Sequence, residues 1–224
     1  MALSGKRPLL LGHRGARSYA HENTYTAFDL ALEHGCDGFE FDVRLTRDEH
    51  CVLFHDARVK RRAIDLHSFA DLTVLFGANA PASLAGVLER YSGRCFLDIE
   101  LKVAGLARQT RDLITRFRPQ HVVASFLPEV LRELKACGPA EMVVGLNVRN
   151  QSQLRRVAEL DADVLIAHRS LVDAELVQAM HAQQKKVFVW TVNSQREMLR
   201  LAGYGVDAII SDDTALLGRT LAGR

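Results

Sequence analysis

Carboxylates recur at every second position in two short hydrophobic segments of the chain. One segment, "GFEFDV", contains Glu40 and Asp42, and the other, "CFLDIELK", contains Asp98, Glu100 and Lys102. Alternate side chains of a strand point to the same side, so each segment would gather its acidic groups on one face. Buried carboxylates repel one another and lose hydration, and a divalent cation offsets both effects. All-oxygen ligands favour Mg2+ or Ca2+ over zinc. The alternative is that these are surface carboxylates, or carboxylates paired with lysine.

Two histidines end strand-like apolar runs in the same way. His13 follows Leu9–Gly12 and precedes Arg14, and His55 follows "CVLF". Imidazole titrates near neutral pH, so such a pair could act as general base and general acid. The planar fork of Arg14 and the point charge of Lys102 suit a phosphate group. Metal, two histidines and two cations on one rim indicate phosphoryl transfer rather than acyl transfer. Three other histidines lack such neighbours, and we interpret them as structural or surface residues: His121, His168 and His181.

The elements that must position these groups alternate along the whole chain. The predicted strands are Leu9–Gly12, Gly38–Val43, Cys95–Leu101, His121–Ser125, Met142–Leu146, Val164–Ala167, Val187–Thr191 and Ala208–Ser211. The predicted helices are Thr24–His34, Ser83–Tyr91, Ala104–Arg116, Pro128–Ala136, Asn150–Leu160, Asp173–Gln183, Ser194–Leu201 and Thr214–Leu221. Strands that alternate with helices predict a parallel sheet, and several strands are apolar throughout, as strands covered on both faces should be. We therefore predict an α/β protein with a (β/α)8 TIM barrel; a doubly wound open sheet is the second choice.

One region interrupts this alternation after the second strand. The segment Cys51–Asp56 is predicted to form a short extra strand, and the pattern from Ala57 to Pro81 is irregular. We expect a single domain over residues 1–224 with a short insertion loop at 57–82. A basic cluster in that loop could attract an anionic group, although a solvated basic loop is the simpler interpretation. The cluster consists of Arg58, Lys60, Arg61 and Arg62.

Composition narrows the classes of function. The 224 residues are 48% apolar and 25% charged, with a formal net charge of +2. A nearly balanced charge predicts no nucleic-acid partner, and no apolar run approaches the ~20 residues of a membrane span. The apolar run Pro8–Leu11 after Lys6 and Arg7 is too short for a signal peptide. Four scattered cysteines suggest reduced thiols, so we expect a cytoplasmic protein. The oligomeric state is left open.

Seven segments in order closely resemble the glycerophosphodiester phosphodiesterase family. They are "GHRGARSYAHENTYTAF", "CDGFEFDVRLTRD", "CVLFHD", "FLDIELK", "VVASFLPEVL", "FVWTVN" and "GVDAIISDDTALL", and together they span nearly the whole chain. The resemblance implies a (β/α)8 barrel that uses a divalent metal, Mg2+ or Ca2+. It also implies hydrolysis of a small-molecule glycerophosphodiester to an alcohol and sn-glycerol 3-phosphate.

The resemblance also implies roles for individual residues. The metal ligands would be Glu40, Asp42 and Glu100, and His13 and His55 would be the general base and acid in one order or the other. Our preferred order has His13 as the base and His55 as the acid that protonates the leaving group. The remaining residues would contact the substrate or its surroundings: Arg14 and Lys102 at the phosphate, Glu22 beside His13 or Arg14, and Trp190 near the glycerol or in the barrel core.

The chain departs from the family pattern in the insertion. The family has a longer insertion that opens with a motif like "LDRTT", and here only Arg61 matches its arginine. Substrate preference is therefore less certain than the reaction. Alternatives on the same barrel are a phospholipase D, a lysophospholipase D-like enzyme or a phosphoinositide-type phosphodiesterase. A phosphate-binding barrel without turnover and a sugar-phosphate isomerase or aldolase are further alternatives. The sequence decides neither the metal, the released alcohol, nor whether water or the glycerol 2-hydroxyl attacks.

Overall fold

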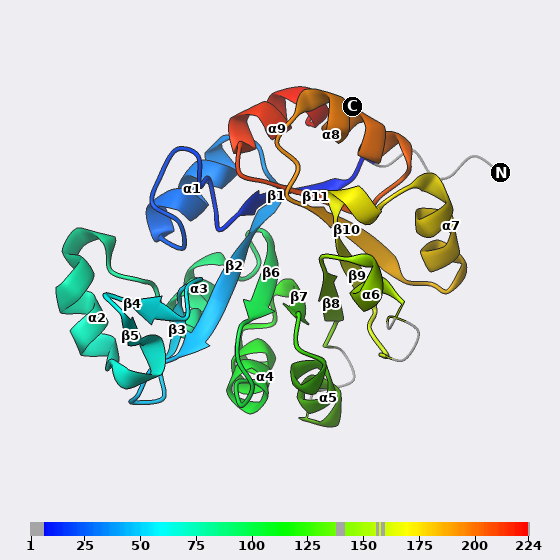
Figure 1. Cartoon of the computed structure of the whole chain (residues 1–224). Coiled ribbons are helices and arrows are strands. Elements are labelled where there is room, and N and C mark those ends of the chain that lie inside the picture. Colours follow the sequence, from blue (N-terminus) through cyan, green and yellow to red (C-terminus); the bar gives the residue numbers. More distant parts are fainter. Residues whose placement is uncertain (1–6, 138–141, 156, 158–159, 224) are drawn as a thin grey trace.

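The computed structural model is a closed barrel of parallel strands surrounded by helices (Figure 1). It describes residues 7–223 except 138–141, 156 and 158–159. Within these residues, eight parallel strands follow the predicted order, and pairing of β1 with both β2 and β11 closes the ring. The strands are β1 (Leu9–His13), β2 (Gly38–Leu45), β6 (Phe96–Leu101), β7 (Gln120–Ser125), β8 (Val144–Val148), β9 (Val164–His168), β10 (Lys186–Trp190) and β11 (Ala208–Ser211). The predicted (β/α)8 barrel is confirmed.

The helices around the barrel also follow the prediction closely. They are α1 (Tyr25–Glu33), α3 (Leu84–Tyr91), α4 (Ala107–Phe117), α5 (Pro128–Cys137), α6 (Gln151–Leu154), α7 (Ala174–Ala182), α8 (Gln195–Gly203) and α9 (Thr214–Leu221). Side-chain oxygens of Thr24, Asp173 and Ser194 accept backbone N–H groups at the starts of α1, α7 and α8, as N-cap residues do. The helix predicted over Asn150–Leu160 is shorter: α6 ends at Leu154, and residues 156, 158 and 159 lie outside the described residues.

Two apolar layers lie against the barrel strands, one inside the barrel and one between the strands and the helices, and each strand side chain points into one of them. Inside the barrel, residues such as Leu11, Ile166 and Ile210 form one buried cluster. Between strands and helices lies a larger cluster, in which Phe39 of β2 stacks on Phe28 of α1 with ring centroids 4.2 Å apart. Because strand side chains alternate, the residues of β2 that flank its outward phenylalanines must point into the barrel. This alternation directs the acidic side chains of β2 inward.

The insertion is more ordered than the sequence predicted. The predicted extra strand before it is β3 (Cys51–Leu53), which pairs antiparallel with β2. The insertion itself contains a hairpin of β4 (Arg58–Val59) and β5 (Arg62–Ala63), and a helix that the sequence did not predict, α2 (Phe69–Phe76). A capping box between Ser68 and Asp71 begins α2, and Leu72 packs with Val52 and Ile64 in a small separate core.

The basic cluster lies on the β4–β5 hairpin. The residues of the turn between the two strands, Lys60 and Arg61, have φ of 46° and 68°. Both turn residues are exposed, as are Arg58 and Arg62 in the strands. No cavity lining in the described part of the chain that includes His13 or His55 contains any of the four. The structure therefore agrees with the solvated interpretation of this cluster.

The four cysteines are free thiols, and three of them are buried. Burial raises the pKa of the Cys36, Cys51 and Cys95 thiols to about 12, so these groups are protonated and unreactive at neutral pH. Cys137 is also free. Across the described ranges, every helix is too short or too polar to cross a membrane.

Gly38 is the glycine whose replacement should damage the barrel most directly. A Cβ at this position would overlap the backbone carbonyl of Phe96, its register partner on β6. We expect Gly38→Ala to lower the free energy of unfolding by about 3 kcal/mol or more, because paired backbone cannot shift to make room. Gly203→Ala is the control: it has no atom within 4 Å of its added Cβ and should change stability by less than ~1 kcal/mol. Urea denaturation measures both, and equal midpoints would contradict the expectation.

Candidate active site

A pocket of about 80 Å³ opens at the carboxyl ends of the barrel strands. Active sites of (β/α)8 barrels lie at this end, where the loops after the strands meet. The sequence-predicted residues in its lining are His13, Arg14, Glu40, His55, Glu100, Lys102 and Trp190. The other two predicted residues, Asp42 and Glu22, both contact Arg14. The structure thus brings all the predicted site residues to one end of the barrel.

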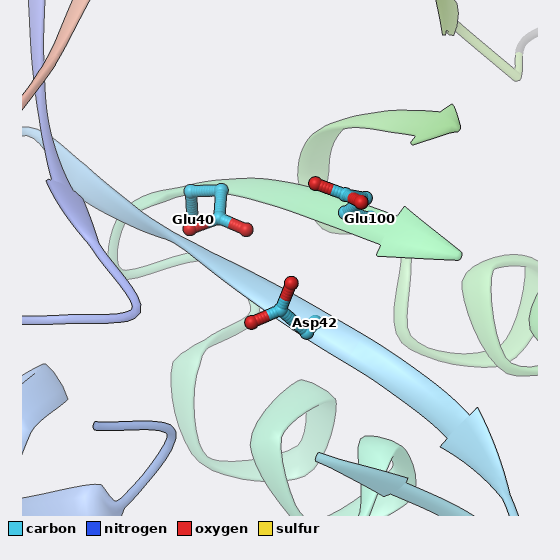
Figure 2. A group of neighbouring side chains, drawn as sticks. All are labelled: Glu40, Asp42 and Glu100. Carbon is cyan, nitrogen blue, oxygen red and sulfur yellow. The ribbon is translucent and has the colours of Figure 1, made fainter. Parts of the chain in front are cut away.

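Three carboxylates from two neighbouring strands gather beside the pocket. Glu40 and Asp42 project from β2 and Glu100 from β6, and all are buried (Figure 2). Register pairing places Asp42 opposite Glu100, and one oxygen from each of the three residues lies within 4.8 Å of the others. Three buried oxygen ligands this close together are the set that a hard divalent cation requires. These residues therefore fit a bound Mg2+ or Ca2+.

The surroundings shift the pKa values of these three carboxyls in different directions. Burial, together with the charges of Asp42, Glu100 and Asp98, raises the pKa of Glu40 well above its ordinary value. Burial also raises the pKa of Glu100. For Asp42, burial acts in the same direction, but the charges of Lys102 and Arg14 outweigh it and lower the pKa. The protein's own cations are therefore insufficient to keep the whole cluster ionised, which is the electrostatic condition that favours a metal ion.

Asp98 is a fourth carboxyl at the base of the pocket. It pairs in register with Glu40, and its Oδ1 atom has no hydrogen-bond partner in the described part of the chain. Burial, with the charges of Glu100 and Asp42, raises its pKa well above the ordinary value. Burial and the neighbouring charges therefore favour the protonated form of Asp98.

Arg14 and Lys102 are the cations that touch the carboxylates. Lys102 Nζ lies 2.5 Å from Glu100 Oε1 and 3.2 Å from Asp42 Oδ1. Arg14 Nε lies 3.2 Å from Asp42 Oδ2, and its backbone N–H donates to Glu40 Oε2 at 2.9 Å. Both cations also line the pocket, so they can contact a phosphate oxygen from there.

The loop after β1 holds Arg14 in this arrangement. Arg14 has a left-handed backbone with φ of 53°, a conformation that costs an ordinary residue about 1 kcal/mol and tends to occur at functional sites. Glu22 accepts two hydrogen bonds from Arg14 Nη1, at 2.9 and 3.0 Å. Asn23 donates from Nδ2 to Asp42 Oδ2 and accepts from the Asp42 backbone N–H. The "EN" pair therefore orients one phosphate-binding candidate and one metal-ligand candidate.

His13 is held by a carboxylate from the other end of the chain. Its Nδ1 atom lies 2.6 Å from Asp212 Oδ1, and Asn193 Nδ2 donates to the other oxygen of Asp212. Burial raises the pKa of Asp212, but the hydrogen bonds from His13 and Asn193 and the charge of Arg17 lower it to about 2. Since Asp212 is ionised, Nδ1 of His13 must carry the hydrogen. Its Nε2, 3.8 Å from Glu40 Oε2, is then the nitrogen that can exchange a proton in the pocket.

His55 follows the extra strand β3 by two residues and also lines the pocket. Its Nδ1 atom lies 2.8 Å from Asp56 Oδ1, which leaves Nε2 for a substrate. The pKa of His55 is lowered, mainly by burial. The charges of Arg14 and Lys102 lower it further, and together these effects outweigh Asp42 and Asp56, which raise it. His55 also borders a second cavity of about 180 Å³, lined by Phe54 and by Phe76 of the insertion. The insertion therefore reaches the site through α2, not through the basic hairpin.

The wall opposite the charged residues is aromatic. Trp190 and Phe126 meet edge to face with centroids 5.5 Å apart, and both line the pocket. The Arg149 guanidinium lies 4.7 Å from the centroid of the Phe126 ring. His168 packs edge to face on Trp190, 5.3 Å away. Trp190 donates from Nε1 to the Ile166 carbonyl, so it is both a pocket wall and part of the barrel packing.

Comparison with known proteins agrees with this geometry. The model of the glycerophosphoryl diester phosphodiesterase family matches residues 13–74 and 88–216. The chain belongs to this family. The family assigns hydrolysis of glycerophosphodiesters, so the protein is a phosphoric diester hydrolase, as the resemblance in the sequence implied.

Relatives and solved structures cover almost the whole phosphodiesterase. A glycerophosphodiester phosphodiesterase of Caldanaerobacter subterraneus is 29% identical, over 94% of this chain and 96% of its own. A phosphodiesterase of Oleispira antarctica, solved with the product sn-glycerol-3-phosphate, is 27% identical with a TM-score of 0.82, and the match covers 96% of each chain. The glycerophosphodiester phosphodiesterase of Thermotoga maritima has the same fold, with a TM-score of 0.80 at 23% identity over 96% of this chain and 99% of its own.

The sequence interpretation missed several polar residues of this phosphodiesterase site. It assigned no role in the site to Asp212, Asn193 or Asn23. Asp212 holds His13, Asn193 holds Asp212, and Asn23 holds Asp42. Nor did it assign Asn147 and Arg149, which line the pocket. A signal existed for Asp212, because the "SDD" segment directly follows the last predicted strand, where barrel sites occur.

The Asp212–His13 contact predicts a loss of turnover when the carboxylate is removed. An amide at position 212 no longer favours the Nδ1-protonated form of His13. We expect Asp212→Asn to lower kcat about 10- to 1000-fold with little change in KM, since the phosphate-binding candidates are untouched. Asp213→Asn is the matched control, because Asp213 caps α9 and does not touch His13. Steady-state kinetics on a glycerophosphodiester measures both variants, and equal kcat values for them would contradict the positioning role.

The low pKa of Asp212 also predicts a pH-dependent contribution to stability. A carboxyl whose pKa is about 2 when folded and 3.8 in the unfolded chain stabilises the protein above pH ~4, and this contribution is lost as the pH falls through 2. At pH 6 we expect the free energy of unfolding of wild type to be about 1 to 2 kcal/mol higher than that of Asp212→Asn. This difference in free energy should narrow below pH 4. Denaturant unfolding at several pH values measures it. A difference independent of pH would exclude the ion pair as its cause.

Proposed function

We propose that the protein hydrolyses glycerophosphodiesters to an alcohol and sn-glycerol 3-phosphate by metal-assisted acid–base catalysis. The observation that carries the proposal is the convergence of His13 and His55 on a pocket bordered by three carboxylates within 4.8 Å of one another. The product bound to the Oleispira antarctica phosphodiesterase supports glycerol 3-phosphate as the product here. The small polar pocket supports a small-molecule substrate.

The metal would be held by Glu40, Asp42 and Glu100. The oxygens, the burial and the raised pKa of Glu40 and Glu100 all support a divalent cation, Mg2+ or Ca2+, at this place. When bound, such a cation polarises a phosphate oxygen and offsets negative charge that develops on it. Arg14 and Lys102 supply two further positive charges on the same rim, and the guanidinium can bind two phosphate oxygens at once.

The two histidines would transfer the protons. His13, with Nδ1 bound to ionised Asp212, accepts at Nε2 the proton of the attacking hydroxyl, either of water or of the glycerol 2-hydroxyl. The new P–O bond forms as the bond to the alcohol breaks, and protonated His55 donates its proton to the leaving oxygen. In the route through the 2-hydroxyl, water then opens the cyclic phosphate with the two roles reversed.

A metal-by-substrate panel tests the proposal on the purified protein. We expect release of sn-glycerol 3-phosphate from glycerophosphocholine, detected with glycerol-3-phosphate dehydrogenase, to stop with EDTA and to return with Mg2+ or Ca2+. Lysophospholipids in the same panel test the phospholipase alternative. Activity that EDTA leaves unchanged would argue against the carboxylate metal site. Hydrolysis of lysophospholipids alone would replace the proposed substrate.

A pair of histidine variants separates chemistry from folding in the same assay. We expect His55→Ala to lower kcat about 100-fold or more, the contribution typical of a general acid. His181→Ala should retain kcat, because His181 bonds Asp207 at the amino end of β11, away from the pocket. Circular dichroism confirms that both fold. Turnover by His55→Ala close to that of His181→Ala would remove His55 from the mechanism.

A further inference from the structure

Asn147 lies on the side of the pocket opposite His13, and the proposed proton transfers do not use it. Its strand, β8, is four strands from β1 in either direction around the barrel. A Cβ at Gly145 on the same strand would meet Ile166, Val122 and Ala124, which belong to the barrel interior. Because Asn147 is two residues further on, its side chain points to the same side. It therefore faces across the pocket toward the charged residues, and it lines the pocket.

The amide of Asn147 is buried without a protein partner. Asn147 is 5% exposed, and its Oδ1 atom has no hydrogen-bond partner among the residues that the structure describes. Buried polar side-chain atoms are nearly always hydrogen-bonded, and one without a partner calls for a specific explanation. The amide lies at the surface of a substrate pocket, so a group of the substrate is the natural partner.

Besides Asn147, the charged or amide side chain on this wall of the pocket is Arg149, whose guanidinium lies over an aromatic ring. Ile166 on the next strand is apolar, and Trp190 has already donated its N–H to the Ile166 carbonyl. Phe126 is covered by the Arg149 guanidinium. Such a wall suits the carbon chain of a short polyol, with the amide beside one hydroxyl. An amide both accepts and donates, and a hydroxyl does the same, so the two groups are complementary.

We propose that Asn147 binds the terminal hydroxyl of the glycerol arm and thereby selects a deacylated glycerophosphodiester. This rests on the proposed function, in which the phosphate lies between Arg14, Lys102 and the carboxylates. The glycerol arm then extends toward β8, and its terminal hydroxyl, the atom furthest from phosphorus, reaches the far wall. An acyl ester at this hydroxyl would remove the hydrogen that it can donate to Asn147 Oδ1, so the contact requires the deacylated arm.

Two substrates that differ by one hydroxyl test the assignment. Glyceryl 4-nitrophenyl phosphate and 2-hydroxypropyl 4-nitrophenyl phosphate have the same leaving group and the same 2-hydroxyl. Attack by water and attack by the 2-hydroxyl are therefore both possible with either substrate. We expect wild type to favour the glyceryl ester about 10- to 100-fold in kcat/KM, since a buried amide left unpaired penalises the analogue. In Asn147→Ala and in the nearly isosteric Asn147→Leu, the preference should fall to within about threefold, because the glyceryl ester loses its hydrogen bond and the analogue no longer leaves an amide unpaired.

Asn150→Ala is the matched control. Asn150 caps α6 three residues away and lies outside the pocket lining, so the preference of wild type should persist in this variant. A wild-type preference near one, or an unchanged preference in either folded Asn147 variant, would overturn the assignment. These outcomes are distinct from failure of the proposed function, which would appear as absence of sn-glycerol 3-phosphate release from glycerophosphocholine by wild type.

Discussion

The burial of several carboxyl groups on two adjacent strands is the constraint on which the rest of the site depends. Glu40 and Asp42 on β2 face Asp98 and Glu100 on β6 across one line of backbone pairing, in a place almost without water. Four anions so close together would cost far more free energy than a domain can spare. The structure meets this by directing Arg14 and Lys102 into the cluster, and burial favours the protonated form of Asp98. A divalent cation would complete the compensation.

The same constraint separates the two halves of the pocket. Charged groups come from β1, β2, β6 and the extra strand β3, whereas Phe126, Ile166 and Trp190 supply apolar surface from the opposite strands. An anionic phosphate and a neutral alcohol arm have matching requirements, so the division orients a phosphodiester before any specific contact is made. Within the apolar half, Asn147 and Arg149 are the exceptions. Arg149 lies over the Phe126 ring, whereas Asn147 Oδ1 has no partner among the described residues and is therefore informative about the substrate.

The sequence predicted what depends on neighbouring residues and missed what depends on closure of the barrel. Glu40, Asp42 and Glu100 were recognisable because acidic residues at alternate positions of an apolar strand are locally anomalous. Helix α2 was missed although its capping box is local, because the surrounding segment lacks a clear apolar period. Asp212 was missed for a different reason. It is 199 residues from His13, and only the pairing of β11 with β1 brings the two together.

The first loop shows how packing far from the pocket becomes part of the chemistry. A Cβ at Gly15 would press on the backbone of Ala27 in α1, so the loop lies directly against this helix. The helix in turn packs through Phe28 on the outer face of β2, the strand whose inner face holds the carboxylates. Arg14, fixed in a left-handed conformation between them, donates its N–H to Glu40. The position of α1 therefore determines how Arg14, the proposed phosphate-binding residue, meets the strand that carries two of the proposed metal ligands. A change in this outer packing should alter the site without touching any residue in it.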